Sequence, residues 1–324
     1  MKQRFFIMAA AALTLAACSN DENMGMTDGP VEARITAGLS APTTRAIGMN
    51  WNADRIGVWV KDAPASDMEN LYKNVLYTTS STGATAEFTA ATGQGIFFQD
   101  ATETVTFAAY APYQPSADNE TLPGDNGKVD VDTETNNTED KQEDIDFLFA
   151  EGATATRTNY TVTFADNTAS SGADHSFHHK MAQLNVVFQV STNDDFAANQ
   201  IFDGSFNLGG LVHDGTFNVT DGTTALTGEP LDSWDISGCK YTDAATTRTY
   251  SLILLPQDLT SKALNVKVGI DGQTYSNSNA INPNLQAGYT YTYTITVKKS
   301  GLKVSGCTIT PWASGSTGSG DAEM

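Results

Sequence analysis

Alternation of apolar and polar residues is the strongest pattern in this chain, and it is clearest near the middle. From Ala182 to Val190 every second residue is apolar, and the residues between them are mostly polar. A period of two over nine residues predicts a β-strand with one face toward a core and the other toward water. A small, polar stretch, 167–174, precedes this region and reads as a linker. We therefore expect a new sheet to begin within 177–190 and to divide the chain into two halves.

The same alternation recurs on both sides of this stretch. Before it, strands are predicted at 31–35, 51–61, 86–98, 104–113, 145–150 and 160–164. After it, a hairpin is predicted at 204–219 and strands at 250–255, 264–270, 289–297 and 302–312, the last bulged at 305–306. No segment keeps a 3.6-residue period over three turns. Short strands separated by turn residues predict an all-β protein built from β-sandwiches.

The stretch 116–146 breaks this regularity and is rich in acidic residues. Asp130, Asp132 and Glu134 occupy the first, third and fifth positions of an EF-hand-like calcium loop. However, Thr135 stands where such a loop needs glycine, and a lysine stands where it needs a bidentate glutamate. We therefore expect the least structured part of the chain here, a solvated acidic loop.

A second candidate metal site is the histidine cluster at the start of the central strand. His175, His178 and His179 lie close together in sequence, but adjacent residues of a strand point to opposite faces. No cysteine or carboxylate at ligand spacing supports them. We expect ordinary histidines at a strand edge and no bound metal or other cofactor.

The net charge and the absence of known catalytic motifs argue against several classes of function. The net charge is −20, from 38 acidic and 18 basic residues, which argues against nucleic acid as a partner because such binding needs a concentrated positive patch. Motifs of serine hydrolases, zinc proteases and P-loop NTPases are absent, and Asp54, Asp100 and Asp258 are isolated acids on turns. We expect a protein that is not an enzyme. A β-sandwich hydrolase that uses the acidic loop is the enzymatic alternative.

The N-terminus has the features of an export signal. Lys2 and Arg4 precede an apolar segment, 5–17, that is too short to span a bilayer and ends in the sequence LAAC at Cys18. This ending resembles the lipobox of bacterial lipoproteins, in which the cysteine is diacylated and becomes the mature N-terminus. The residues after Cys18 are then expected to be exported and tethered by lipid.

The other two cysteines, Cys239 and Cys307, fit no zinc or redox motif because the chain lacks CxxC. They could pair as a disulfide in an oxidising compartment, or remain two buried thiols.

Several segments together resemble the fimbrillin family, the lipoprotein-derived type V pilins of Bacteroidia. In chain order they are the lipobox at Cys18, TTRA before DRIGVWV, VTFAAYAPY, DIDFLFA, FHHKMAQLNVVF, LILLPQDL, LQAGYTYTYTITV and the closing CTITPW. The resemblance covers nearly the whole mature chain. It implies two tandem transthyretin-like β-sandwich domains in a protein of the outer membrane surface and the fimbrium. The implied parts are a lipoprotein signal peptide (1–17), a tether with a removable first strand (18–45), two sandwiches (46–173 and 174–313) and a flexible tail (314–324).

The resemblance also implies how such a subunit assembles. A protease would cut between Arg45 and Ala46 and remove a first strand. Its inward residues are Val31, Ala33 and Ile35. The groove left behind would receive a strand from another pilin subunit, and the fibre would serve adhesion to an unidentified surface ligand. The candidate donor strand near the C-terminus carries Leu302, Val304, Cys307, Ile309 and Trp312.

An alternative is a surface lipoprotein that does not polymerise. In this case Arg45 remains uncut and the lipid at Cys18 is kept, as in fimbrial anchors. Exposed aromatic residues such as Trp51, Trp59 and Trp234 could then bind a glycan.

Overall fold

The computed structural model describes residues 29–39, 51, 54–170, 172–194, 196–277 and 281–312. By its contacts the chain divides into two units, Met1–Pro30 and Val31–Met324, and all described strands and helices lie in the second. The α-helices are short, α1 (Met68–Leu71) and α2 (Gln142–Ile145), and the predominance of strands confirms the all-β prediction. Among the described residues, no helix is long and apolar enough to cross a bilayer. The part of the chain that the structure describes also contains three short 3-10 helices: η1 (Thr168–Ser170), η2 (Thr192–Asp194) and η3 (Ala198–Asp203).

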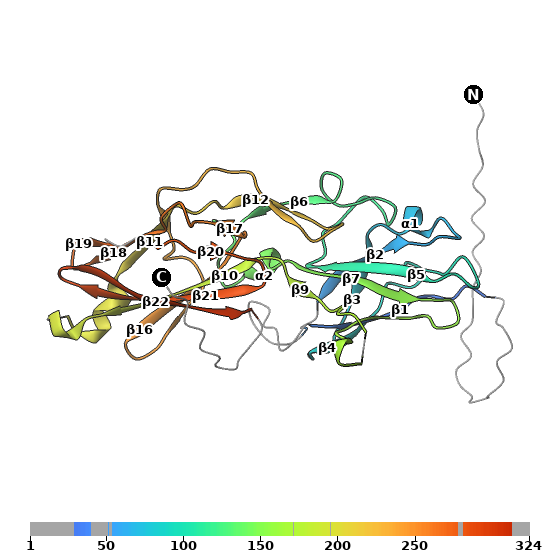
Figure 1. Ribbon diagram of the computed structural model, residues 1–324, viewed down its shortest axis with the longest axis horizontal. Helices are drawn as coiled ribbons and strands as arrows, with labels where there is room; N and C mark the ends of the chain where they lie inside the picture. The colour runs from blue at the N-terminus through green and yellow to red at the C-terminus, as the bar shows by residue number, and fades with distance from the viewer. Residues whose placement is uncertain are drawn as a thin grey trace, which may run out of the picture. The chain divides into compact units, whose positions relative to one another are not determined.

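The first half of this unit contains two sheets that share one core. The larger sheet has the strand order β3-β2-β5-β7-β9 and the smaller one the order β4-β1-β8. Buried side chains of both sheets meet in this core, among them Val58 and Phe107 from the larger sheet and Phe88 and Phe164 from the smaller. Figure 1 shows these strands in blue to green. Their bounds are β1 (Arg34–Gly38), β2 (Arg55–Asp62), β3 (Val75–Thr78), β4 (Thr85–Phe88), β5 (Val105–Ala111), β7 (Leu148–Ala155), β8 (Thr161–Phe164) and β9 (His178–His179).

The second half also contains two sheets around a core, with the strand orders β15-β16-β10-β21-β22 and β14-β11-β18-β19. The central strand β10 has the predicted alternation, since every inward residue from Ala182 to Val190 is buried. Transthyretin-like folding of each half and the domain boundaries stay predictions. The strands are β10 (Ala182–Val190), β11 (Ser205–Gly209), β14 (Trp234–Asp235), β15 (Tyr241–Asp243), β16 (Thr247–Leu254), β18 (Asn265–Ile270), β19 (Gln273–Ser276), β21 (Tyr289–Lys298) and β22 (Gly301–Pro311), with a separate pair, β17 (Gln257–Asp258) and β20 (Asn284–Leu285).

The last strand is bulged where the sequence predicts it. Tyr293 of β21 lies opposite Cys307, and Ile295 lies opposite Val304, so two residues of β22, 305–306, face a single residue of β21. The extra residue shifts the side chains that follow it to the other face of the strand. The bulge prediction is confirmed.

The start of the central stretch differs from the expectation. The new sheet begins at Ala182 and not at Phe177, because β9 (His178–His179) pairs with β7 and Phe177 lies in the core of the first half. Met181 and Ala182 are both buried, which breaks the period of two at the point where the chain passes from one sheet to the next. The two adjacent histidines do face opposite ways, His178 exposed and His179 buried.

A further sheet joins the two halves. It has the order β13-β12-β6, in which β6 (Lys128–Asp132) comes from the first half and β12 (Asp214–Asn218) and β13 (Thr224–Leu226) come from the second. Figure 1 shows β6 beside β12, although they are far apart in sequence. Beneath this sheet lies a third core, with residues such as Phe147 and Phe217 stacked at 4.4 Å.

The prediction that 116–146 is a solvated loop is therefore wrong for the second part of this stretch, which contains β6 and α2. Val129 and Val131 alternate with acidic residues and point into the third core, and Ile145 is buried as well. Asp132, at the end of β6, accepts hydrogen bonds from the main-chain N–H groups of the next turn. The count of acidic residues concealed a short strand, because its acids occupy only the outer face.

Asn137 attaches this segment to the second half. Its side-chain oxygen accepts a hydrogen bond from Ile253 N at 2.6 Å, and its amide nitrogen donates to Ile253 O at 2.8 Å. The fully buried amide thus satisfies the main chain of β16 as a neighbouring strand would. Gln142 adds two bonds, to Asn137 Oδ1 at 2.9 Å and to Ser251 O at 2.6 Å.

We expect Asn137→Ala to lower the free energy of unfolding by about 2–3 kcal/mol, because it leaves the buried N–H and C=O of Ile253 without these partners. Chemical denaturation of the purified protein measures this loss. Asn136→Ala is the matched control. Asn136 makes one hydrogen bond to Asp132 O and is only partly buried, so its replacement is expected to lower the free energy by less than about 1 kcal/mol. Equal losses in the two variants would contradict the structural role of Asn137.

Candidate functional site

The first strand, β1, is the strongest candidate for a functional element. It lies between β4 and β8, antiparallel to the first and parallel to the second. The pairing with β4 runs from Ile35 opposite Phe88, and the pairing with β8 runs from Arg34 opposite Thr161. In Figure 1, β1 (blue) runs below β5 and β7. An element at the start of the chain thus occupies the centre of a sheet whose neighbours come from much later in the sequence.

Main-chain hydrogen bonds continue beyond both ends of β1. Ala33 N donates to Ile96 O at 2.8 Å, and Leu39 N donates to Ala84 O at 3.2 Å. On the other side, Phe177 N donates to Gly38 O at 3.1 Å. The segment 31–39, about 30 Å long when extended, therefore fills a groove that pairs with it on both edges.

The side chains of this segment alternate in the predicted way. Ala33, Ile35 and Ala37 are buried in the first core, and Val31 and Leu39 pack against it. Of the residues between them, Arg34 is exposed, Glu32 and Thr36 are partly buried, and Gly38 is buried. The predicted inward residues of the removable strand, Val31, Ala33 and Ile35, therefore line one face. Sequence reasoning ended this strand at 35 and missed 36–38, since small residues and a glycine weaken the pattern there.

Trp51 packs in the same core and contacts the strand that fills the groove. Its indole Nε1–H donates a hydrogen bond to Ala37 O at 3.1 Å, and its main-chain N–H donates to Gly83 O at 2.9 Å. The ring meets Phe88 at 5.0 Å and Phe177 at 5.2 Å, in both cases edge to face. Trp51 is fully buried, so it cannot serve as an exposed aromatic platform for a glycan.

The other two tryptophans of that alternative are also packed. Trp234 is buried in the core of the second half, and Trp59 packs against the third core with its indole nitrogen buried. The proposed platform of Trp51, Trp59 and Trp234 is therefore wrong.

The predicted lipid attachment residue, Cys18, and the predicted cut between Arg45 and Ala46 lie outside the described residues. The chain that joins Leu39 to Trp51 contains this cut. A cut there would place the whole of β1 on one side and Trp51 on the other.

The candidate donor strand is β22, an edge strand that pairs with β21 alone in its sheet. The five candidate residues have different surroundings: Leu302 is buried, Val304 and Cys307 pack against the second core, Ile309 is 38% exposed, and Trp312 is 2% exposed. Neither Cys307 nor Cys239 forms a disulfide in the structure.

Trp312 lies in a buried polar cluster that sequence reasoning missed. Its ring stacks on His179 at 4.1 Å with an angle of 6° between the planes. His179 Nδ1 lies 2.7 Å from Asp146 Oδ1, and both side chains are buried. The main-chain N–H of Trp312 donates to Gly288 O at 2.7 Å. Residues from three distant segments thus hold the end of β22, and no motif in the sequence connects them.

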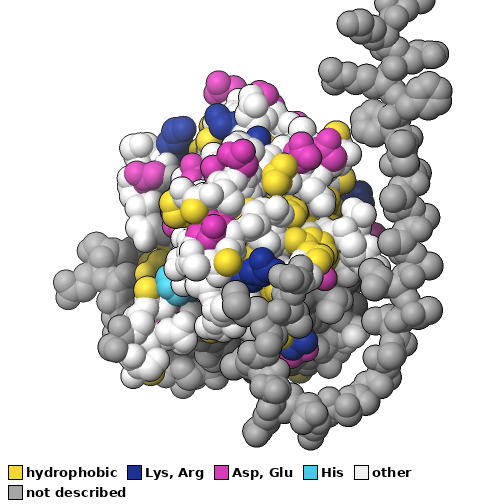
Figure 2. All heavy atoms as spheres, turned by 90° about the vertical axis from the view of Figure 1, so that its right-hand side faces the viewer, with side chains coloured by type: hydrophobic (Ala, Val, Ile, Leu, Met, Phe, Trp, Pro, Cys, Tyr) yellow, Lys and Arg dark blue, Asp and Glu magenta, His cyan; other side chains and the backbone are white. Residues whose placement is uncertain are grey.

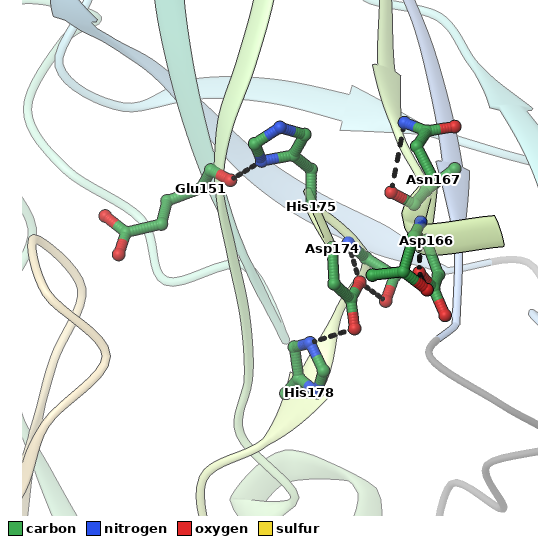
Figure 3. A network of polar contacts seen from close by, with 9 residues as sticks. Glu151, Asp166, Asn167, Asp174, His175 and His178 are labelled. Carbon is green, nitrogen blue, oxygen red and sulfur yellow. Dashed lines mark hydrogen bonds and ion pairs between the residues drawn. The ribbon is translucent and has the colours of Figure 1, made fainter. Parts of the chain in front are cut away.

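The other two histidines of the predicted cluster, His175 and His178, have different partners, as Figure 3 shows. His178 Nε2 lies 3.1 Å from Asp174 Oδ2, and His175 Nδ1 lies 2.8 Å from Glu151 O. The His175 ring fits against Gly152, whose positive φ of 84° and missing side chain leave room for it. Among the described residues, no three His, Cys, Asp or Glu side chains gather where they could bind a metal ion.

Two of the isolated acids, Asp100 and Asp258, accept hydrogen bonds from main-chain N–H groups that follow them closely in the sequence. The main-chain N–H groups of Thr102 and Glu103, with the Thr102 hydroxyl, hold the pKa of the Asp100 carboxyl below its usual value. Asp258 is similar, because the Thr260 N–H and hydroxyl lower the pKa of its carboxyl. In Figure 2, basic side chains (dark blue) are scattered among acidic ones (magenta) on the face shown, without one continuous basic patch.

Comparisons with known proteins agree with this architecture. A family model described as fimbrillin-like matches residues 44–312. A relative from Bacteroides uniformis, the "putative fimbrium subunit Fim1C", is 31% identical over 99% of each chain. A solved "putative cell adhesion protein" from Bacteroides ovatus has a TM-score of 0.68 and 27% identity, over 88% of this chain and 98% of its own. A second, from Bacteroides uniformis, has a TM-score of 0.64 and 25% identity, over 89% and 100%. By its sequence match over most of its length, the chain belongs to the fimbrillin-like family.

Proposed function

We propose that this protein is a structural pilin subunit of surface fimbriae, and that β1 occupies the assembly groove until it is removed. The observation that carries the proposal is the position of β1, which pairs on both edges and buries Ala33, Ile35 and Ala37. A cut after Arg45 detaches this strand from the rest of the chain without breaking any other strand of the sheet. The subunit is exported as a lipoprotein acylated at Cys18 before this cut.

Removal of β1 favours the binding of another strand in its place. The edges of β4 and β8 lose their main-chain partners, and the core loses three buried apolar side chains. Unpaired edges and exposed apolar surface both favour β-augmentation by an extended segment. A strand supplied by the next subunit makes a head-to-tail contact that does not close on itself, which generates a fibre.

The partners are therefore other pilin subunits, and β22 is the candidate donor. The relatives described as a fimbrium subunit and as cell adhesion proteins support a fibre at the cell surface that serves adhesion. A surface lipoprotein that does not polymerise is the second candidate. The burial of Trp312 favours it, since this residue holds β22 within its own subunit.

N-terminal sequencing of the protein taken from the cell surface tests the proposal. We expect the mature chain to begin at Ala46 and to form a ladder of polymers on unboiled gels. Arg45→Ala is expected to keep the acylated Cys18 and abolish the ladder. Arg34→Ala, at an exposed position of β1, is the control and is expected to leave both results unchanged.

A ladder formed by the Arg45→Ala variant would contradict the requirement for strand removal. A wild-type chain that stays monomeric with an acylated Cys18 would favour the lipoprotein that does not polymerise.

A further inference from the structure

His213 is a buried histidine in the sheet that joins the two halves, β13-β12-β6, here called the joining sheet. It comes directly before β12 and is 3% exposed. Its main-chain oxygen accepts a hydrogen bond from Thr133 N at 3.0 Å, and its Nδ1 lies 3.0 Å from the Thr133 hydroxyl oxygen. Thr133 follows β6 directly, so both contacts cross between the halves and extend the pairing of β12 with β6 by one position.

The second ring nitrogen of His213 has no hydrogen-bond partner. Nε2 is buried, and none of the groups that the structure describes pairs with it. The ring packs edge to face against Trp234 of β14, with 4.4 Å between the centroids. The preceding residue is also held, since the buried Gln257 side chain pairs with both N–H and C=O of Val212. The His213 ring therefore has little freedom to turn toward water.

The surroundings of His213 favour its neutral form. Burial of the ring lowers the pKa of His213 from 6.5 to about 4, and the nearby Asp132 carboxylate only partly offsets this effect. The other charged groups on the elements around the ring are Asp214 of β12, Asp235 of β14 and Asp258 of β17, and all three are exposed. A neutral ring protonated at Nδ1 leaves only a lone pair unmatched at Nε2, whereas a charged ring adds a buried N–H without an acceptor.

We propose that protonation of His213 opens the joining sheet. In the closed sheet the charged ring is buried with one N–H unpaired, and separation of β12 from β6 allows it to reach water. The pKa of the ring is about 4 in the closed sheet and about 6.5 in water, so the open form binds more protons between these two pH values. A fall in pH through this range therefore favours opening, and the two outer cores remain folded. This inference does not depend on the proposed function.

Hydrogen exchange of the full chain, measured by mass spectrometry, tests the inference. Protection is corrected for the pH dependence of the intrinsic exchange rates. It is then compared between peptides that cover β6 and β12 and peptides that cover β2 and β10, which belong to the two outer cores. From about pH 7.5 to about pH 5, we expect protection of the joining sheet to fall at least about tenfold. Protection of β2 and β10 is expected to change by less than about twofold.

Two variants remove the titrating group in different ways. His213→Asn keeps a polar partner for Thr133 and cannot be protonated. His213→Phe keeps an aromatic ring against Trp234 and has no nitrogen. In both, we expect protection of the joining sheet to agree within about twofold at the two pH values. Each variant is compared with itself, so a lower protection at both pH values leaves the test intact.

His178→Asn is the matched control, because His178 is exposed and pairs with Asp174 outside the joining sheet. We expect it to retain the fall in protection seen in the parent chain. A fall that persists in both His213 variants would overturn the inference and assign the response to another group, such as the buried His179. An unchanged joining sheet in the parent, or an equal loss in β2 and β10, would overturn it as well.

Discussion

Trp312→Ala is expected to lower the free energy of unfolding by about 3–5 kcal/mol. Trp312 is 2% exposed, packs in the core that joins the two halves and stacks on His179. Alanine would leave a cavity beside the buried pair of His179 and Asp146, and a site that contains this pair cannot collapse freely. Urea denaturation of the full chain followed by circular dichroism measures the change.

Ile309→Ala is the control on the same edge of the molecule. Ile309 lies three residues earlier and is 38% exposed, so its replacement is expected to lower the free energy by less than about 1 kcal/mol. Similar losses in the two variants would mean that the end of β22 is not anchored by the tryptophan.

This anchor bears directly on the role of β22. To act as a donor, the strand must give up its pairing with β21 and also withdraw Trp312 from the third core. Its bulge at 305–306 further separates it from the regular alternation of the segment 31–39, whose place it would take. Withdrawal of Trp312 therefore adds to the energetic cost of separating β22 from β21.

The long strands could be predicted from sequence because their environment has a period of two. β10 and β21 each have a core on one face and water or polar neighbours on the other, so burial alone produces the pattern. The central position of β1 within its sheet could not be derived in this way. Pairing partners such as Phe88 and Val162 are distant in sequence, and nothing local encodes them.

The errors have the same physical origin. The stretch 116–146 looked solvated because its charges outnumber its apolar residues, yet Val129 and Val131 are enough to attach a strand when a partner from the second half is present. Likewise, His179 looked like an ordinary edge residue, and its burial depends on Asp146 and Trp312. Contacts between distant segments decide both cases.

The burial of β1 in its groove can be tested by replacing one of its inward side chains. Ile35→Ala is expected to lower the free energy of unfolding of the uncut chain by about 2–5 kcal/mol. Ile35 is 1% exposed and lies opposite Phe88 on one side and Val162 on the other. These neighbours belong to paired strands and cannot move far to fill the space that the missing side chain leaves.

Thr36→Ala on the outer face is the matched control for this variant. The Thr36 hydroxyl donates to Val162 O at 3.3 Å and to Thr163 Oγ1 at 3.1 Å, the latter an exposed bond, so the expected loss is below about 1 kcal/mol. Equal losses at positions 35 and 36 would contradict the burial of this strand in the core.

The strongest form of this experiment compares the chain before and after the cut at Arg45. If β1 leaves with the cut segment, Ile35→Ala and the parent become the same molecule, and their stabilities must converge. If β1 stays in its groove after the cut, the difference between them must persist. Convergence together with an overall loss of stability would show that the groove is vacant and available to another strand, because only an empty groove lacks both the side chain at 35 and the main-chain pairing around it.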